Sequence, residues 1–284
     1  MVGGARLAGV GVIGLALVLG LATKVLKQES SMNDSTPRIV SVALLQPAAE
    51  LLAQEPMAYY REDMRGPDNW DTMPLYLTEF ASGSNLKPTM TGGPIVLRYQ
   101  DRNCPIELPG GRQFMAGLEG PVVGRISMVF PMEPMTLAEA RQMVAQIVGQ
   151  FDRGWPRVGK VREGLTEGDF STDAGTKVAT IGRWRQCGNG PAQVHITVRH
   201  YNSSTGSSFT PPAALSAPLS EDAADRFLIY ANFTPATQQL SRKLSELVSS
   251  RRAAEGLDPA YEDLPAAIWL DDPDWRPAGW DGGF

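Results

Sequence analysis

Hydrophobic residues are distributed unevenly along the chain, and the longest uninterrupted run lies near its start. Residues 7–23 read LAGVGVIGLALVLGLAT and contain no charged side chain. About 17 apolar residues are enough for a helix to cross a bilayer, because a helix satisfies its own backbone hydrogen bonds. The pattern predicts an uncleaved membrane anchor over residues 1–27.

A cleaved signal peptide is the alternative interpretation of this run. Arg6 supplies a weakly basic start, and residues 20–22 place small side chains at a spacing that suits cleavage. Lys24 and Lys27 follow the run directly. Basic residues in this position favour an interfacial stop over cleavage.

The charges on either side of the run support two orientations. A strict count of basic residues places the large domain in the cytoplasm, because Lys24, Lys27 and Arg38 follow the run and only Arg6 precedes it. A short N-terminal tail with one arginine is also typical of a signal anchor, which exports the domain that follows. We expect export, with a single-pass anchor and a periplasmic or other extracytoplasmic domain.

After the anchor, the hydrophobic pattern is at first weak. Residues 28–37 are polar and without periodicity, which is typical of a linker. In the region 38–93 an apolar stretch at 39–45 precedes a short helix candidate at 48–54, and we expect a strand at 75–80. The whole region 38–93 is therefore predicted to be irregular α+β structure.

The pattern becomes regular from residue 94 to residue 256 and predicts an α+β core domain. Apolar residues alternate with polar ones, or form short β-branched runs, in several segments between turn residues. The predicted strands are 95–99, 122–130, 177–186, 193–201 and 226–233.

Two longer segments in this domain have the periodicity of amphipathic helices. Thr136 and Glu139 form the sequence pattern of a capping box at the start of the first helix. In the second helix we expect Thr234 as the cap, Pro235 as the first helical residue and Gly256 as the stop.

The order of these elements predicts the architecture. Long helices interspersed with strands that are mostly joined by short turns are typical of an α+β fold. We expect a two-layer domain in which a mainly antiparallel sheet carries both amphipathic helices on one face.

The tail, residues 257–284, combines aromatic and acidic side chains. Its four prolines lead us to expect no regular element. Tryptophan is enriched at protein interfaces, so we expect the tail to bind a partner, unless its aromatic residues fold back over the chain's own sheet. The predicted partner-binding residues are Trp269, Trp275, Trp280 and Phe284.

Charge and cysteine content narrow the class of protein. The net charge of −5 argues against a nucleic-acid-binding protein, which would present a basic surface. Cys104 and Cys187 lie too far apart for a CxxC motif, and each is in a polar turn. For an exported domain this favours a disulfide between them over two unrelated buried thiols.

The chain offers little that points to catalysis. His195 and His200 lie on one predicted strand at an odd separation, so they point to opposite faces and cannot share a metal ion. We find no nucleophile elbow, no HExxH motif and no phosphate-binding glycine loop. The sequence therefore predicts no catalytic residue, no cofactor and no metal site.

These observations predict a membrane-anchored envelope protein that acts as a non-catalytic protein-binding module, such as an accessory protein, an adaptor or an immunity-type inhibitor. Its expected partners are another protein of the cell envelope and, through residues 7–23, the lipid bilayer, but not nucleic acid. Two alternatives remain open. One is an envelope hydrolase that uses His195, and the other is a structural subunit of a membrane complex.

Overall fold

The computed structural model describes residues 36–57, 78–81, 94–170, 178–200, 226–258, 264 and 266–281. Within these ranges no helix combines the length and the apolar composition needed to span a membrane. The predicted anchor at 7–23 lies outside the described residues, as do most of the linker and Phe284.

A six-stranded antiparallel sheet forms the larger layer, with the strand order β2-β5-β6-β9-β8-β7. The prediction of an α+β fold with an antiparallel sheet is confirmed. The bounds of the strands are β2 (Thr78–Ala81), β5 (Gln113–Glu119), β6 (Val122–Met135), β7 (Val178–Arg185), β8 (Ala192–His200) and β9 (Phe227–Pro235).

A second, three-stranded sheet has the order β1-β3-β4. Strand β1 (Arg38–Val42) runs parallel to β3 (Ile95–Tyr99), and β3 is antiparallel to β4 (Ile106–Glu107). Strand β1 comes from the region 38–93, so this region shares a sheet with the segment that follows it.

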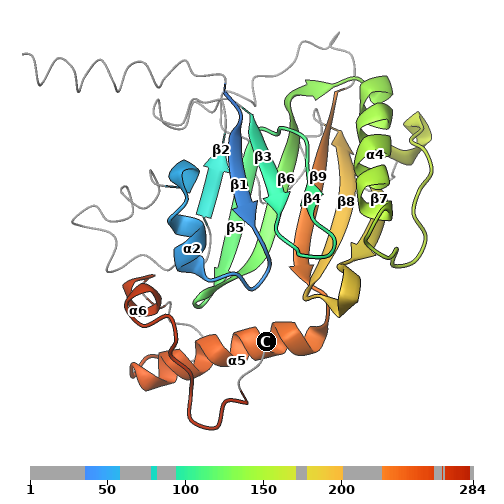
Figure 1. Ribbon diagram of the computed structural model, residues 1–284. Helices are drawn as coiled ribbons and strands as arrows, with labels where there is room; N and C mark the ends of the chain where they lie inside the picture. The colour runs from blue at the N-terminus through green and yellow to red at the C-terminus, as the bar shows by residue number, and fades with distance from the viewer. Residues whose placement is uncertain are drawn as a thin grey trace, which may run out of the picture.

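The remaining elements are helical. They are α2 (Ala48–Leu52), α4 (Leu137–Asp152), α5 (Gln238–Ala254) and α6 (Ala266–Asp271), with 3₁₀ turns η1 (Glu55–Met57), η3 (Glu167–Phe170) and η4 (Cys187–Asn189). Figure 1 shows the small sheet and α4 in front of the large sheet, whereas α5 runs across the lower ends of the strands. The expectation that both long helices share one face of the sheet is therefore wrong.

The main core lies between the large sheet and the layer in front of it. In β6, Ile126, Met128 and Phe130 are fully buried, as the period of two residues in a strand requires. Helix α4 adds Ile147 and Phe151 to the same core, and both are fully buried. The amphipathic pattern of this helix thus faces the sheet as predicted.

The two long helices begin differently from one another. Thr136 and Glu139 form the predicted capping box on α4: the Glu139 N–H donates to Thr136 Oγ1 (3.4 Å) and the Thr136 N–H to Glu139 Oε2 (2.7 Å). For α5 the cap is Thr237, whose Oγ1 accepts from the Leu240 N–H at 3.1 Å. The prediction of Thr234 was wrong because β9 continues through Pro235, which still pairs with Ala192.

The sequence pattern missed β5 and α6. All five inner residues of β5 are buried, so the strand lacks the alternation by which a half-exposed strand is recognised. Helix α6 fits between Pro265 and Pro273, because a proline directly before a helix or beyond its end does not interrupt the helical hydrogen bonds. The expectation that the tail holds no regular element is therefore wrong.

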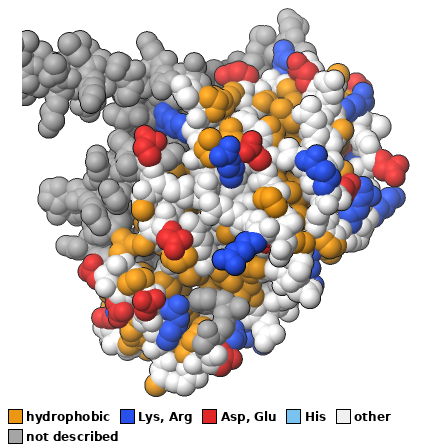
Figure 2. All heavy atoms as spheres, viewed as in Figure 1, with side chains coloured by type: hydrophobic (Ala, Val, Ile, Leu, Met, Phe, Trp, Pro, Cys, Tyr) orange, Lys and Arg blue, Asp and Glu red, His pale blue; other side chains and the backbone are white. Residues whose placement is uncertain are grey.

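Charged side chains are dispersed over the face of the molecule that carries α4. Figure 2 shows basic and acidic groups interspersed among polar and apolar atoms, with basic groups more frequent toward the right-hand edge. Among the residues that are described, this face therefore shows no large area of one charge.

Replacing two glycines by alanine, one inside α4 and one just after α5, should change the stability of the fold in opposite directions. Gly256 ends α5 at φ +76°, a conformation that costs an alanine about 1 kcal/mol, so Gly256→Ala should destabilise the fold by that amount. Gly149 lies inside α4 with open space around an added Cβ, so Gly149→Ala should stabilise the fold by about 0.5–1 kcal/mol. Chemical denaturation of both variants checks this, and a shift of the same sign in both would contradict the boundaries of these two helices.

Candidate functional site

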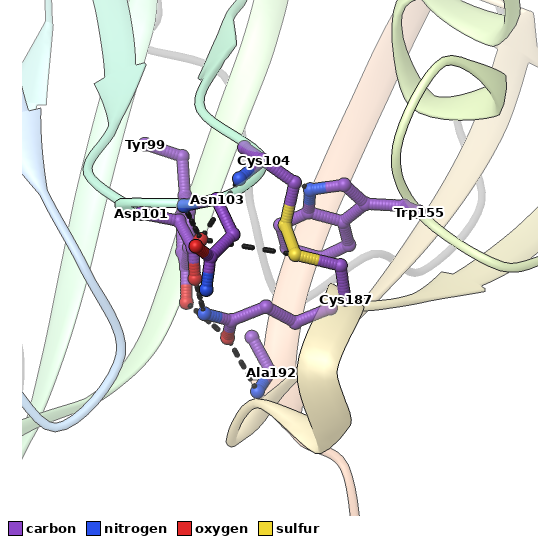
Figure 3. The surroundings of a disulfide bond; sticks show 8 residues. Tyr99, Asp101, Asn103, Cys104, Trp155, Cys187 and Ala192 are labelled. Carbon is purple, nitrogen blue, oxygen red and sulfur yellow. Dashed lines mark hydrogen bonds between the residues drawn. A yellow bond between two sulfur atoms is a disulfide. The ribbon is translucent and has the colours of Figure 1, made fainter.

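A disulfide joins the two sheets at one end of the molecule. Cys104 lies between β3 and β4, and Cys187 begins η4 between β7 and β8. Their sulfur atoms are 2.11 Å apart and their Cα atoms 6.3 Å apart, a separation that suits a disulfide (Figure 3). The predicted pairing of the two cysteines is confirmed.

The buried side chain of Gln186 lies beside this disulfide and contacts both sheets. Its Oε1 accepts from the Tyr99 hydroxyl at 3.0 Å and from the Ala192 N–H at 3.1 Å, and its Nε2 donates to Asp101 (Figure 3). The Tyr99 hydroxyl also accepts from the Leu44 N–H at 3.2 Å. One amide therefore links β3, the loop after it and the β7–β8 hairpin.

Asp101 is held as a carboxylate by this arrangement. It accepts hydrogen bonds from the N–H groups of Asn103 (2.7 Å) and Cys104 (2.9 Å) as well as from Gln186. Partial burial would raise the pKa of Asp101, but the three donors outweigh it and hold this pKa below its usual value of 3.8.

Aromatic rings close the inner side of the same region. The indole N–H of Trp155 donates to the Cys104 carbonyl at 2.9 Å, and its ring meets that of Tyr99 edge-on at 5.2 Å. Tyr99 also stacks on Phe233 of β9 at 5.1 Å. We call the set Tyr99, Asp101, Cys104, Trp155, Gln186 and Cys187 the junction.

A shallow groove of about 850 Å³ lies on the outer side of the junction. Its charged lining residues are Arg98, Asp101, Arg102, Glu107 and Arg153. The Arg98–Glu107 ion pair (2.6 Å) is more than half exposed on both sides, so it contributes little stability. The groove is charged and open, which suits contact with a polar partner better than enclosure of a small molecule.

Among the described residues, three side chains of the junction lie close enough together to be considered as ligands of one metal ion. The ligand atoms of Asp101, Cys104 and Cys187 lie within 4.8 Å of one another. Cysteine binds metals as a thiolate, and here both sulfurs form the disulfide. With the disulfide formed, these two cysteines hold the structure together and are not metal ligands.

The two histidines lie on opposite faces of β8, as predicted. His200 is buried and its ring meets that of Phe227 edge-on at 5.3 Å, whereas His195 is partly exposed on the other face. The cross-strand neighbours of His195 are Asn232 and Arg183, neither of which is an acid. Ser127 lies beyond Asn232, roughly 10 Å from His195 at the usual strand spacing, which is too far for a hydrogen bond between the two side chains.

Burial and the charges of Arg183 and Arg199 lower the pKa of His195. A neutral imidazole of this kind can act as a base, but a hydrolase also needs a nucleophile and an orienting acid within hydrogen-bond reach. The described neighbours on β7, β9 and β6 supply neither to His195.

The aromatic tail packs on α5 and on the turn between β5 and β6. Trp269 is 3 % exposed and lies in a small cluster with Leu247 and Leu264. Its ring covers Gly120, where an added Cβ would come within 3.2 Å of the ring. Trp269, one of the predicted partner-binding residues, thus has a packing role within this chain.

A buried arginine connects the tail to α5. The Arg251 guanidinium lies 5.8 Å from the ring centre of Trp269 and 4.8 Å from that of Trp275, and it pairs with Asp272 at 3.2 Å. Near the end of the described tail, Lys243 pairs with Asp281 at 2.7 Å and lies 5.8 Å from the ring centre of Trp280. Trp275 and Trp280 nonetheless remain partly exposed.

Sequence reasoning did not identify Gln186, Tyr99, Asp101 or Arg251 as important. Each is a polar residue whose role depends on partners distant in the sequence, so no local pattern could have shown it. The two cysteines alone marked the location of the junction.

No protein-family model, no curated protein and no solved structure matches the chain.

The dependence of the free energy of unfolding on pH, at its acidic end, tests the role of Asp101. Because its pKa is lower in the folded chain, its contribution is complete above the usual carboxyl value of 3.8 and is lost as the pH falls through the lower folded value. Asp101→Asn should therefore lower stability at neutral pH and flatten the loss of stability below about pH 4. Denaturation followed from pH 7 to pH 2 checks this, and an unchanged pH dependence at the acidic end in the variant would contradict the assigned hydrogen bonds.

Proposed function

We propose that this chain is a membrane-anchored envelope protein whose exported domain binds another protein and does not catalyse a reaction. The observation that carries the proposal is the Cys104–Cys187 disulfide at the point where the two sheets meet. Disulfides form and persist in oxidising compartments and are rare in the cytosol. The bridge therefore supports export of the domain, and residues 7–23 supply the anchor in this proposal.

The surroundings of the histidines support a binding role over a hydrolytic one. His195 has an asparagine and an arginine as cross-strand neighbours, and His200 is buried against Phe227. Among the described residues, the cross-strand neighbours of His195 do not provide the nucleophile and acid that a hydrolase using this histidine requires.

The outer part of the tail is the proposed contact surface for the protein partner. Trp275 and Trp280 are partly exposed, and the neighbouring Asp271 and Asp274 are exposed. Trp269 holds this surface on α5 through its buried ring. A rigid aromatic anchor flanked by acidic groups suits an accessory protein, an adaptor or an immunity-type inhibitor.

One labelling experiment tests export and partner binding together. The chain has two cysteines and both are in the disulfide, so one added cysteine is the only free thiol. Ala278→Cys places this thiol beside Trp280, and Gly164→Cys places it in the loop between α4 and β7, where an added side chain meets open space. A membrane-impermeant maleimide that carries a photoreactive group is then applied to intact cells or spheroplasts.

We expect both variants to be labelled without permeabilisation, because the domain is exported. On illumination, Ala278→Cys should form a crosslink to one discrete protein, whereas Gly164→Cys should not. Labelling only after permeabilisation would overturn export. Efficient labelling of Ala278→Cys without any discrete crosslink would overturn the tail as the binding surface.

A further inference from the structure

The face of the large sheet that points away from α4 carries a row of cationic and hydrogen-bonding side chains. On β8 the alternate residues 193, 195, 197 and 199 point to this face, because Val194, Ile196 and Val198 point into the core. The register places Arg183 opposite His195 and Arg185 opposite Gln193. We call Arg183, Arg185, His195, Thr197 and Arg199 the basic row.

Four polar atoms of the basic row have no hydrogen-bond partner among the described residues. They are the Nε atoms of Arg185 and Arg199, the His195 Nε2 and the Thr197 Oγ1, and all four are buried. Thr197 as a whole is only 6 % exposed. Buried polar groups are almost always hydrogen-bonded, so four such atoms in one row set this face apart from the rest of the sheet.

The charge of the row is also uncompensated. Within the described part of the chain, none of the ion pairs involves Arg183, Arg185 or Arg199. The lowered pKa of His195 reflects the same surplus of positive charge, because Arg183 and Arg199 disfavour its protonation. An acidic chain of net charge −5 thus holds a local concentration of arginine that suits an anion.

The arginines are positioned for contact. Arg183 is exposed, whereas Arg185 and Arg199 are partly exposed. The Arg199 guanidinium lies over the Tyr230 ring at 4.3 Å from its centre, which fixes its plane. A guanidinium edge binds a carboxylate through two parallel hydrogen bonds.

The spacing of the row distinguishes a single small anion from an extended ligand. Alternate residues of a strand are about 6.6–6.8 Å apart, so residues 193 to 199 of β8 span roughly 20 Å. One small anion cannot contact donors over this length. A peptide in extended conformation repeats its side chains at the same interval, so every second residue of such a peptide can face one position of the row.

We infer that the basic row binds an extended acidic segment of a partner protein. The inference rests on the proposed function and specifies the chemistry of one partner contact. A protein segment is favoured over nucleic acid because the net negative charge of this chain repels a long polyanion, whereas a few carboxylates bind within the local positive field.

The test uses the purified full-length chain in detergent and a fluorescent heptapeptide, Glu-Thr-Glu-Thr-Glu-Thr-Glu. Each arginine–carboxylate contact should account for about tenfold in affinity, so Arg183→Gln should weaken binding about tenfold and the double variant with Arg199→Gln about a hundredfold. Arg242→Gln removes the same charge from an exposed position on α5 and should leave the affinity unchanged. Arg183 is exposed, so the single variant remains informative even if the double variant is unstable.

His195 provides a local signal for the same binding event. The chain has only two histidines, so the NMR resonance of the His195 ring is assigned by comparison with the variant His195→Asn. Carboxylates bound beside Arg183 and Arg199 should raise the pKa of His195 relative to the free chain. A structural role alone would not produce this change on addition of peptide.

Three results would overturn the inference. They are equal binding of a peptide with glutamine in place of glutamate, an affinity unaffected by Arg183→Gln, and tighter binding of heptathymidylate than of the acidic peptide. The assay does not depend on membrane orientation. A failure of export and a failure of peptide binding are therefore distinguishable.

Discussion

The connection between the two sheets at the junction is the constraint on which the rest of the structure depends. The small sheet and the β7–β8 hairpin are far apart in the sequence, and the Cys104–Cys187 bridge spans 83 residues. Closing a loop of this length lowers the entropy of the unfolded chain enough to stabilise the fold by about 4 kcal/mol. The bridge therefore offsets much of the cost of bringing these segments together.

The noncovalent contacts of the junction give the bridge a defined geometry. Gln186 accepts from Tyr99 and Ala192 and donates to Asp101, so it fixes the hairpin relative to β3. Trp155 donates to the Cys104 carbonyl and extends the contact into the aromatic core below α4. A disulfide without these partners would restrict the chain but would not orient the sheets.

The tail and α5 form a separate cluster around Leu247, Leu264 and Trp269. Arg251 lies beside the rings of Trp269 and Trp275 and pairs with Asp272, so a charge on α5 holds the acidic tail. Helix α5 crosses the lower ends of the strands (Figure 1), and Trp275 and Trp280 in this cluster remain partly exposed. The proposed partner surface and the structural centre of the domain are thus different parts of the molecule.

The sequence predictions are correct where the interacting residues are close together in the sequence, and they fail where the partners are distant in the sequence. The capping box of α4 and the alternation of β6 are set by residues within a few positions of one another, and both were predicted. Strand β5 and the cap at Thr237 depend on tertiary packing: β5 is buried on both faces, and the pairing of Pro235 with Ala192 delays the start of α5. Gln186 and Arg251 could not be predicted, because their partners come from other elements.

Amide hydrogen exchange of the oxidised and the reduced full-length chain tests the central claim that the junction holds the small sheet on the large one. The account predicts that reduction lowers the protection of Val40 in β1 and Leu97 in β3 more than that of Val194 and Ala231 in the large sheet. These four residues are all fully buried when the bridge is intact. Equal loss of protection in both sheets, or no loss in either, would contradict the claim.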